Sequence, residues 1–136
     1  MMGELGESGP VWGPIHTLMP GTVVFTADAA CPIDYNSFSF GYYLFDIGWS
    51  FIWNGPADRR RAFLESYQRV IQLPENHVSL IEAFHVAARI LFLALYAQNP
   101  GEKSLDGERK FVDHECASYL EEKNFLFEKG SWSEEK

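Results

Sequence analysis

The sequence feature that most constrains the fold is a long apolar stretch, residues 78–97, which is long enough to cross a membrane. Its charged and imidazole side chains are Glu82, His85 and Arg89, and their spacing of three and four residues places them on one face of a helix. Charged residues at the centre of a membrane helix cost roughly 2.5–3.5 kcal/mol each on insertion. We therefore expect a buried helix of a cytoplasmic protein without a membrane partner, with these side chains forming a buried network or lining a pocket.

Three further helices are expected. Residues 43–53 are apolar nearly all round, which is typical of a central helix, and Asn54-Gly55-Pro56 would end it. Asp58 can cap a second helix over residues 59–72, and the triplet Arg59-Arg60-Arg61 at its start is expected to be a solvated surface. The long helix spans residues 76–98, and an amphipathic stripe predicts a last helix over 108–123.

The N-terminal third favours short strands. Residues 23–26 and 31–35 are expected to pair as a small hairpin, followed by a loop over 36–41 with Phe38 and Phe40 as aromatic anchors. The predicted fold class is mainly α (α+β), a helical bundle with one small β-hairpin. The expected organisation is an irregular segment over 1–14, a single domain over 15–123 and a frayed tail over 124–136.

Composition excludes some functions. With 136 residues and a formal net charge of −8, the chain lacks the basic surface that a nucleic-acid partner requires. Cys31 and Cys116 lie far apart, and two reduced, buried thiols are favoured over a disulfide. The segment His114-Glu115-Cys116-Ala117-Ser118 has serine where a zinc-binding HExxH helix needs its second histidine, so we expect a solvated helix face there.

Three short segments in order carry a resemblance to a known family. They are Pro14-Ile15-His16-Thr17-Leu18-Met19-Pro20-Gly21-Thr22-Val23-Val24-Phe25, then Pro32-Ile33-Asp34-Tyr35, then Phe40-Gly41-Tyr42-Tyr43-Leu44-Phe45-Asp46-Ile47-Gly48. This pattern resembles the C-terminal lobe of the aminoglycoside phosphotransferase/choline kinase family, over roughly residues 14–98. That family has I-H-G-D-L-H-P-G-N-V-L-F, I-D-F-D and G-x-x-x-x-D-L-A in the same order. The resemblance implies a kinase-like C-lobe fragment.

The resemblance also implies roles for individual residues. Aligned without gaps, Thr17 occupies the position of the catalytic aspartate and Thr22 that of the Mg²⁺-binding asparagine. Asp34 matches the other metal-binding aspartate, here expected to be vestigial, and Asp46 matches the helix aspartate that braces the catalytic loop through its backbone. A threonine hydroxyl is no base near pH 7 and a poor ligand for Mg²⁺, so we expect neither a catalytic residue nor a cofactor.

Three functions follow from these observations. The favoured one is a catalytically silent remnant of a small-molecule phosphotransferase, acting as an interaction or regulatory module. No segment corresponds to the family's N-lobe, so a homodimer or a protein partner is expected to cover the missing N-lobe face. The alternative is part of an ATP- and Mg²⁺-dependent small-molecule phosphotransferase whose N-lobe is missing or supplied in trans. The third is a cation-binding domain that uses Trp49, Trp53 and Glu82.

Overall fold

The computed structural model describes residues 11–17, 22–53, 55–98 and 105–128. The chain is mainly helical with short strands, as predicted. Its elements in order are β1 (Trp12–Ile15), β2 (Val23–Phe25), β3 (Ala30–Pro32), a short 3₁₀ turn η1 (Tyr35–Ser37), β4 (Ser39–Tyr42), α2 (Tyr43–Ser50), α3 (Ala57–Gln68), α4 (His77–Gln98) and α5 (Leu105–Leu120).

The strands form two small antiparallel sheets. β2 pairs with β3, with Val24 opposite Cys31, which confirms the predicted hairpin. β1 pairs with β4, with Gly13 opposite Gly41, so the predictions of an irregular segment up to residue 14 and of a loop over 36–41 are wrong for these strands. Glycine and proline disfavour strands, which hid β1 in the sequence. The Tyr43 hydroxyl fills the space that a β-carbon on Gly13 would take, so a larger residue here would displace that side chain.

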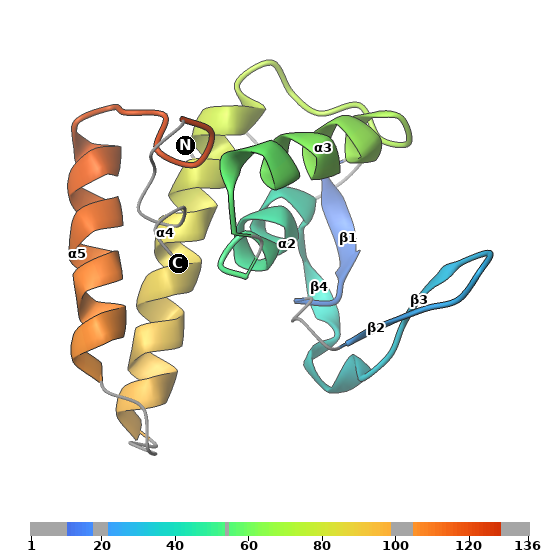
Figure 1. The fold of residues 1–136 in the computed structure, drawn as a ribbon, viewed down its shortest axis with the longest axis horizontal. Helices are drawn as coiled ribbons and strands as arrows, with labels where there is room; N and C mark the ends of the chain where they lie inside the picture. Colours follow the sequence, from blue (N-terminus) through green and yellow to red (C-terminus); the bar gives the residue numbers. More distant parts are fainter. Residues whose placement is uncertain (1–10, 18–21, 54, 99–104, 129–136) are drawn as a thin grey trace.

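The helices pack around α2 and α4. α4 and α5 lie side by side, and α2 packs against α4 as the predicted central helix (Figure 1). A β-carbon on Gly48 would lie 2.8 Å from the backbone nitrogen of His85, so only glycine allows this close approach of α2 to α4. The largest fully buried side chains include Phe51, Ile81 and Leu126, which define the centre of the core.

The long apolar stretch forms α4, as predicted. Within the described part of the chain, α4 is the one helix long and apolar enough to cross a membrane by length and composition alone, and half of its apolar window is buried inside the protein. Two of the three polar residues on its face, His85 and Arg89, form the expected buried network. Glu115 Oε2 lies 3.2 Å from His85 Nε2 and 3.1 Å from Arg89 Nε. Glu115 and Ser118 are both buried, so the prediction of a solvated helix face is wrong for these two residues.

Two other predicted surface segments contribute to the core. Arg60 is 2% exposed, and its guanidinium donates to the Leu126 carbonyl oxygen at 3.1 Å and to the Phe51 carbonyl oxygen at 3.4 Å. The triplet is thus not wholly solvated. Phe125 and Leu126 are buried, so the prediction of a frayed tail is wrong for these two residues, and residues 129–136 lie outside the described part. Arg60 and the tail bury each other, a long-range contact that local sequence does not encode.

The remaining differences are local. α3 begins at Ala57, so Asp58 lies in its first turn and does not cap it, and the helix ends at Gln68. Both cysteines are free, as expected, but Cys31 is exposed, because it lies on the outlying hairpin and not in the core.

Candidate functional site

Asp46 in the first turn of α2 braces the segment that follows β1. Its Oδ1 accepts the backbone N–H of Thr17 at 2.6 Å, and its Oδ2 accepts that of His16 at 3.3 Å. Pairing of β1 with β4, which leads directly into α2, brings these residues together. Thr17 has φ 51°, a left-handed conformation that is uncommon for a β-branched residue. Such conformations persist where the surroundings fix them, and they concentrate at functional sites.

The side chain of Thr17 is engaged by backbone carbonyls. Its hydroxyl donates to the His16 carbonyl oxygen at 2.7 Å, and the Ser37 carbonyl oxygen lies 3.4 Å away. Both neighbours are acceptors, so the hydroxyl acts as a donor. The loop therefore holds no base at the position where the resemblance placed the catalytic aspartate.

Asp34 and Thr22 lie at the base of the β2–β3 hairpin. The Thr22 carbonyl oxygen accepts the Ile33 N–H at 2.7 Å. Asp34 has φ 63°, and its exposed carboxylate accepts a hydrogen bond from the Asn36 side chain at 2.7 Å. Among the described residues, no group of three or more His, Cys, Asp or Glu is placed to hold a metal ion. A single carboxylate with hydroxyl neighbours would hold Mg²⁺ weakly.

Thr17 also borders an apolar pocket of about 470 Å³ between α2 and the C-terminal half of α4. The described lining residues carry no charge; they are Thr17, Ser37, Phe45, Trp49, Leu91, Phe92, Leu95 and Tyr96. Trp49 is 7% exposed and packs edge-on against Phe92, with ring centroids 6.4 Å apart. Trp53 packs against the same ring at 5.1 Å and is not one of these lining residues.

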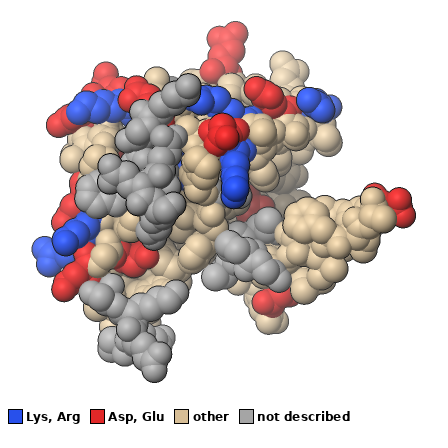
Figure 2. Space-filling model, viewed as in Figure 1, with Lys and Arg blue, Asp and Glu red and all other residues tan. Residues whose placement is uncertain are grey.

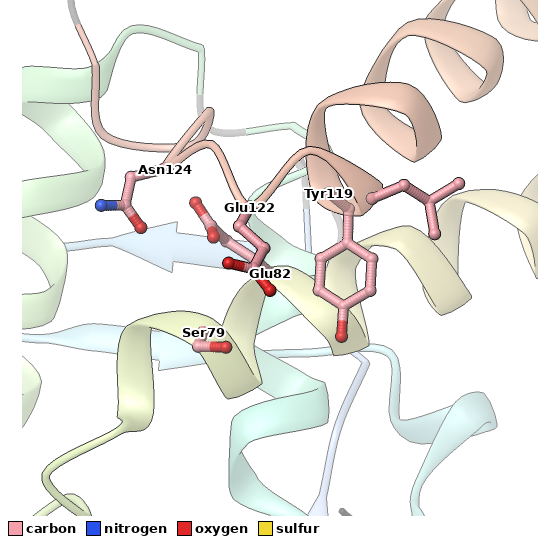
Figure 3. Close-up of a pocket in the computed structure, with 6 residues that line it drawn as sticks. Ser79, Glu82, Tyr119, Glu122 and Asn124 are labelled. Atoms are coloured by element: carbon pink, nitrogen blue, oxygen red, sulfur yellow. The ribbon is translucent and has the colours of Figure 1, made fainter.

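Glu82 lies in a different pocket, of about 460 Å³, between α4 and the end of α5 (Figure 3). The structure thus brings Thr17 and Trp49 to one pocket and places Glu82 in another, so the three residues of the predicted cation site do not share a cavity. Sequence reasoning missed Ser37 and Tyr96 at the first pocket. Nothing in their local pattern indicates that η1 and α4 meet at this pocket.

The β2–β3 hairpin, η1 and the residues that follow as far as Phe40 in β4 expose a concentration of apolar side chains. The hairpin extends away from the helices in Figure 1, and Figure 2 shows it as a mainly uncharged projection with acidic atoms at its margins. The large hydrophobic residues between 24 and 40 are 44–78% exposed; they are Val24, Phe25, Ile33, Tyr35, Phe38 and Phe40. Phe38 and Phe40 contact each other, at 6.1 Å between centroids, and are not the anchors that the sequence predicted.

Comparison with known proteins found no matching family model, no matching curated protein and no matching solved structure.

Proposed function

We propose that this chain is a catalytically silent binding module, built on a scaffold like the catalytic lobe of small-molecule phosphotransferases, and that it acts through protein association. The observation that carries the proposal is the pair of hydrogen bonds from the backbone of His16 and Thr17 to Asp46. This is the bracing contact that the resemblance implies. It supports a retained loop scaffold in which the reacting side chains have been replaced.

The replacements remove the groups that phosphoryl transfer requires. The reaction depends on a carboxylate that orients the attacking hydroxyl and on oxygen ligands that hold Mg²⁺ against the phosphates. Thr17 offers a hydroxyl already donated to a carbonyl oxygen, and Thr22 offers no amide side chain. Loss of a positioned base alone costs about 10²–10⁴-fold in rate.

The exposed hairpin supports association as the remaining role. An isolated two-stranded hairpin is marginally stable in water, so a surface that covers it would stabilise it. Phe25, Tyr35, Phe38 and Phe40 are 48–78% exposed, which corresponds to roughly 500 Å² of residue surface in total. The largest apolar patch on a typical soluble monomer is about 300–600 Å², and such patches are often functional. A standard interface buries about 800 Å² per partner, of which these rings would supply more than half.

A second copy of the chain is the proposed occupant of this surface. The charged residues between 22 and 42 are Asp28 and Asp34, and both lie outside β2 and β3. The strands themselves therefore carry no charge that would oppose pairing with an identical hairpin. Two-fold symmetric contact between identical surfaces is the commonest form of association.

Measurements of nucleotide binding and phosphate transfer test whether the site at Thr17 and Thr22 is catalytically silent. We expect no shift in the melting temperature with ATP and Mg²⁺, and no transfer of the γ-phosphate to water, choline or an aminoglycoside. The matched variant restores both positions, Thr17→Asp with Thr22→Asn. A shift with Mg²⁺–ATP that appears only in the restored variant supports lost chemistry on a retained scaffold, and a shift in the unmodified chain contradicts the proposal.

The alternative is a phosphotransferase that is completed in trans by an N-lobe. The retained brace at Asp46 favours it, because a working loop needs the same support. It requires the unmodified Thr17 chain to gain activity when a separate N-lobe is added. If the chain with an added N-lobe is active only when it also carries Thr17→Asp, the alternative is excluded.

A further inference from the structure

Trp49 carries a buried indole N–H without an acceptor. The residue is 7% exposed, and within the described part of the chain its Nε1 has no hydrogen-bond partner. An indole nitrogen only donates, so no change of tautomer or protonation can satisfy it. A buried tryptophan usually places this group against an acceptor, because a buried donor that lacks one destabilises the protein. The described residues therefore leave one hydrogen bond at Trp49 unmade.

The same residue lines the apolar pocket between α2 and the C-terminal half of α4. The pocket volume of about 470 Å³ lies within the range of sites that hold small organic molecules, about 300–1,000 Å³. Half of its described lining residues are aromatic: Phe45, Trp49, Phe92 and Tyr96. The rings of Phe45 and Phe92 lie 6.1 and 6.4 Å from that of Trp49, between centroids. Tyr96 packs on Phe92 at 4.5 Å. The pocket thus combines aromatic walls with an unsatisfied donor.

We propose that this pocket binds a neutral, planar aromatic molecule that carries a hydrogen-bond acceptor. A planar ring can pack edge-on or offset against the lining rings, as they pack against one another. Its acceptor atom takes the Trp49 N–H. The described lining residues carry no charge, so an ionised molecule would be buried there without a counter-charge. A quaternary ammonium is attracted by aromatic faces but has no acceptor, so it would leave the indole N–H unsatisfied.

The pocket is open to solvent along α4. Its lining residues Leu91 and Leu95 are 46% and 48% exposed, so a molecule can enter beside them without opening the core. A bound ring would cover these leucines, and that burial of apolar surface adds to the hydrogen bond. The inference goes beyond the proposed function and does not depend on it, because the contacts that carry it come from α2 and α4. They require neither a dimer nor a silent Thr17 loop.

Titration with quinoline and naphthalene at pH 8 tests the proposal. The two molecules share one planar frame, and only quinoline carries an acceptor nitrogen, which is uncharged at this pH. We expect quinoline to bind saturably with one site per chain by calorimetry. In NMR spectra its binding should move the Trp49 indole proton downfield, as formation of a hydrogen bond does, and naphthalene should not. Choline, the cationic probe, should not bind.

The ratio of the quinoline and naphthalene affinities isolates the hydrogen bond, because the difference in hydrophobicity between the two molecules cancels when variants are compared. Trp49→Phe keeps an aromatic ring and removes the N–H, and the ratio should fall about three- to tenfold. Trp53→Phe is the matched control. The Trp53 Nε1 is also buried without a partner among the described residues, but Trp53 is not one of the lining residues, so the ratio should not change.

A second variant covers the case in which Trp49→Phe does not fold. Leu95 is half exposed at the pocket, so Leu95→Trp should fill the cavity without disturbing the core and abolish quinoline binding. Ile90→Trp is its control, because Ile90 is 50% exposed on the same helix and is not a lining residue; this variant should bind quinoline like the unmodified protein.

The proposal is overturned if the unmodified protein does not bind quinoline, if the Trp49 indole proton does not move downfield, or if choline binds as tightly. It is also overturned if the affinity ratio is unchanged in folded Trp49→Phe or falls equally in Trp53→Phe. Unchanged quinoline binding by folded Leu95→Trp would place the molecule elsewhere and contradict it as well.

Discussion

The carboxylate of Asp46 accepts the backbone N–H of Thr17 at 2.6 Å, across 29 positions of sequence. A hydrogen bond to an ionised acceptor is stronger than a neutral one. This contact fixes a left-handed threonine at the point where the β1–β4 sheet meets α2.

Asp46→Asn should loosen the Thr17 loop. The amide has one acceptor oxygen for two N–H donors, so one of them loses its partner. Hydrogen bonds to charged groups contribute about 1.5–3 kcal/mol, and we expect amide exchange at Thr17 to be at least tenfold faster. Hydrogen exchange by NMR measures this directly. In the control Asp58→Asn, the exposed partner of the Arg59 N–H, exchange at Thr17 should not change. If the amide of Thr17 exchanges at the same rate in Asp46→Asn and in the unmodified protein, the contact with Asp46 does not hold the loop.

Glu115→Gln should strongly destabilise the fold. Glu115 joins α5 to α4 through His85 and Arg89, and removing one partner of a buried ion pair costs about 3–5 kcal/mol. Burial raises the pKa of Glu115, but His85 and Arg89 outweigh it and hold that pKa below its ordinary 4.5. The contribution is therefore present above pH 4.5 and lost as the pH falls through the lowered value.

Urea unfolding at pH 7 and in the acid range measures this loss. The exposed pair Arg109–Asp113, at 3.9 Å, supplies a control, and Asp113→Asn should cost less than about 1 kcal/mol. A Glu115→Gln protein as stable at pH 7 as the Asp113→Asn protein would contradict the role of the network.

The contribution of Glu82 to stability should depend on pH in the opposite direction to that of Glu115. Its pKa is about 7 in the folded protein against an ordinary 4.5, so the folded state binds a proton that the unfolded state releases. The stabilising contribution is present below pH 4.5 and declines as the pH rises to about 7. Above pH 7, Glu82→Gln should be more stable than the unmodified protein by about 1–3 kcal/mol, after allowance for solvent screening of the carboxylate. Urea unfolding at pH 5 and pH 8 checks this difference, and an equal gain at both values would contradict it.

Local patterns in the sequence predicted much of the fold. The hairpin, α2 and α4 follow from strand-forming residues, apolar periodicity and stop signals, and the buried polar face of α4 follows from the spacing of Glu82, His85 and Arg89. β1 was hidden because Gly13 and Pro14 form a strand only through pairing with β4.

The missed features of the site depend on contacts between distant segments. Arg60 is buried because the segment after α5 returns to α3, and Glu115 is buried because α5 packs on α4. The resemblance indicated Asp46 as a brace, and its contact with Thr17 is present. It gave no indication of the pocket around Glu82, which α4 forms with the end of α5 and the turn that follows.

Sedimentation equilibrium of the purified chain at micromolar concentration tests the central claim most directly. We expect a dimer, and a monomer for the double variant Phe25→Ser with Phe40→Ser, since these rings are 78% and 67% exposed on the proposed interface. Val70→Ser is the matched control, because Val70 is 85% exposed but lies outside the segment 24–40 that carries the proposed interface, and it should remain a dimer. A monomeric unmodified chain, or a dimer that the double variant leaves intact, would contradict association through the apolar surface of residues 24–40.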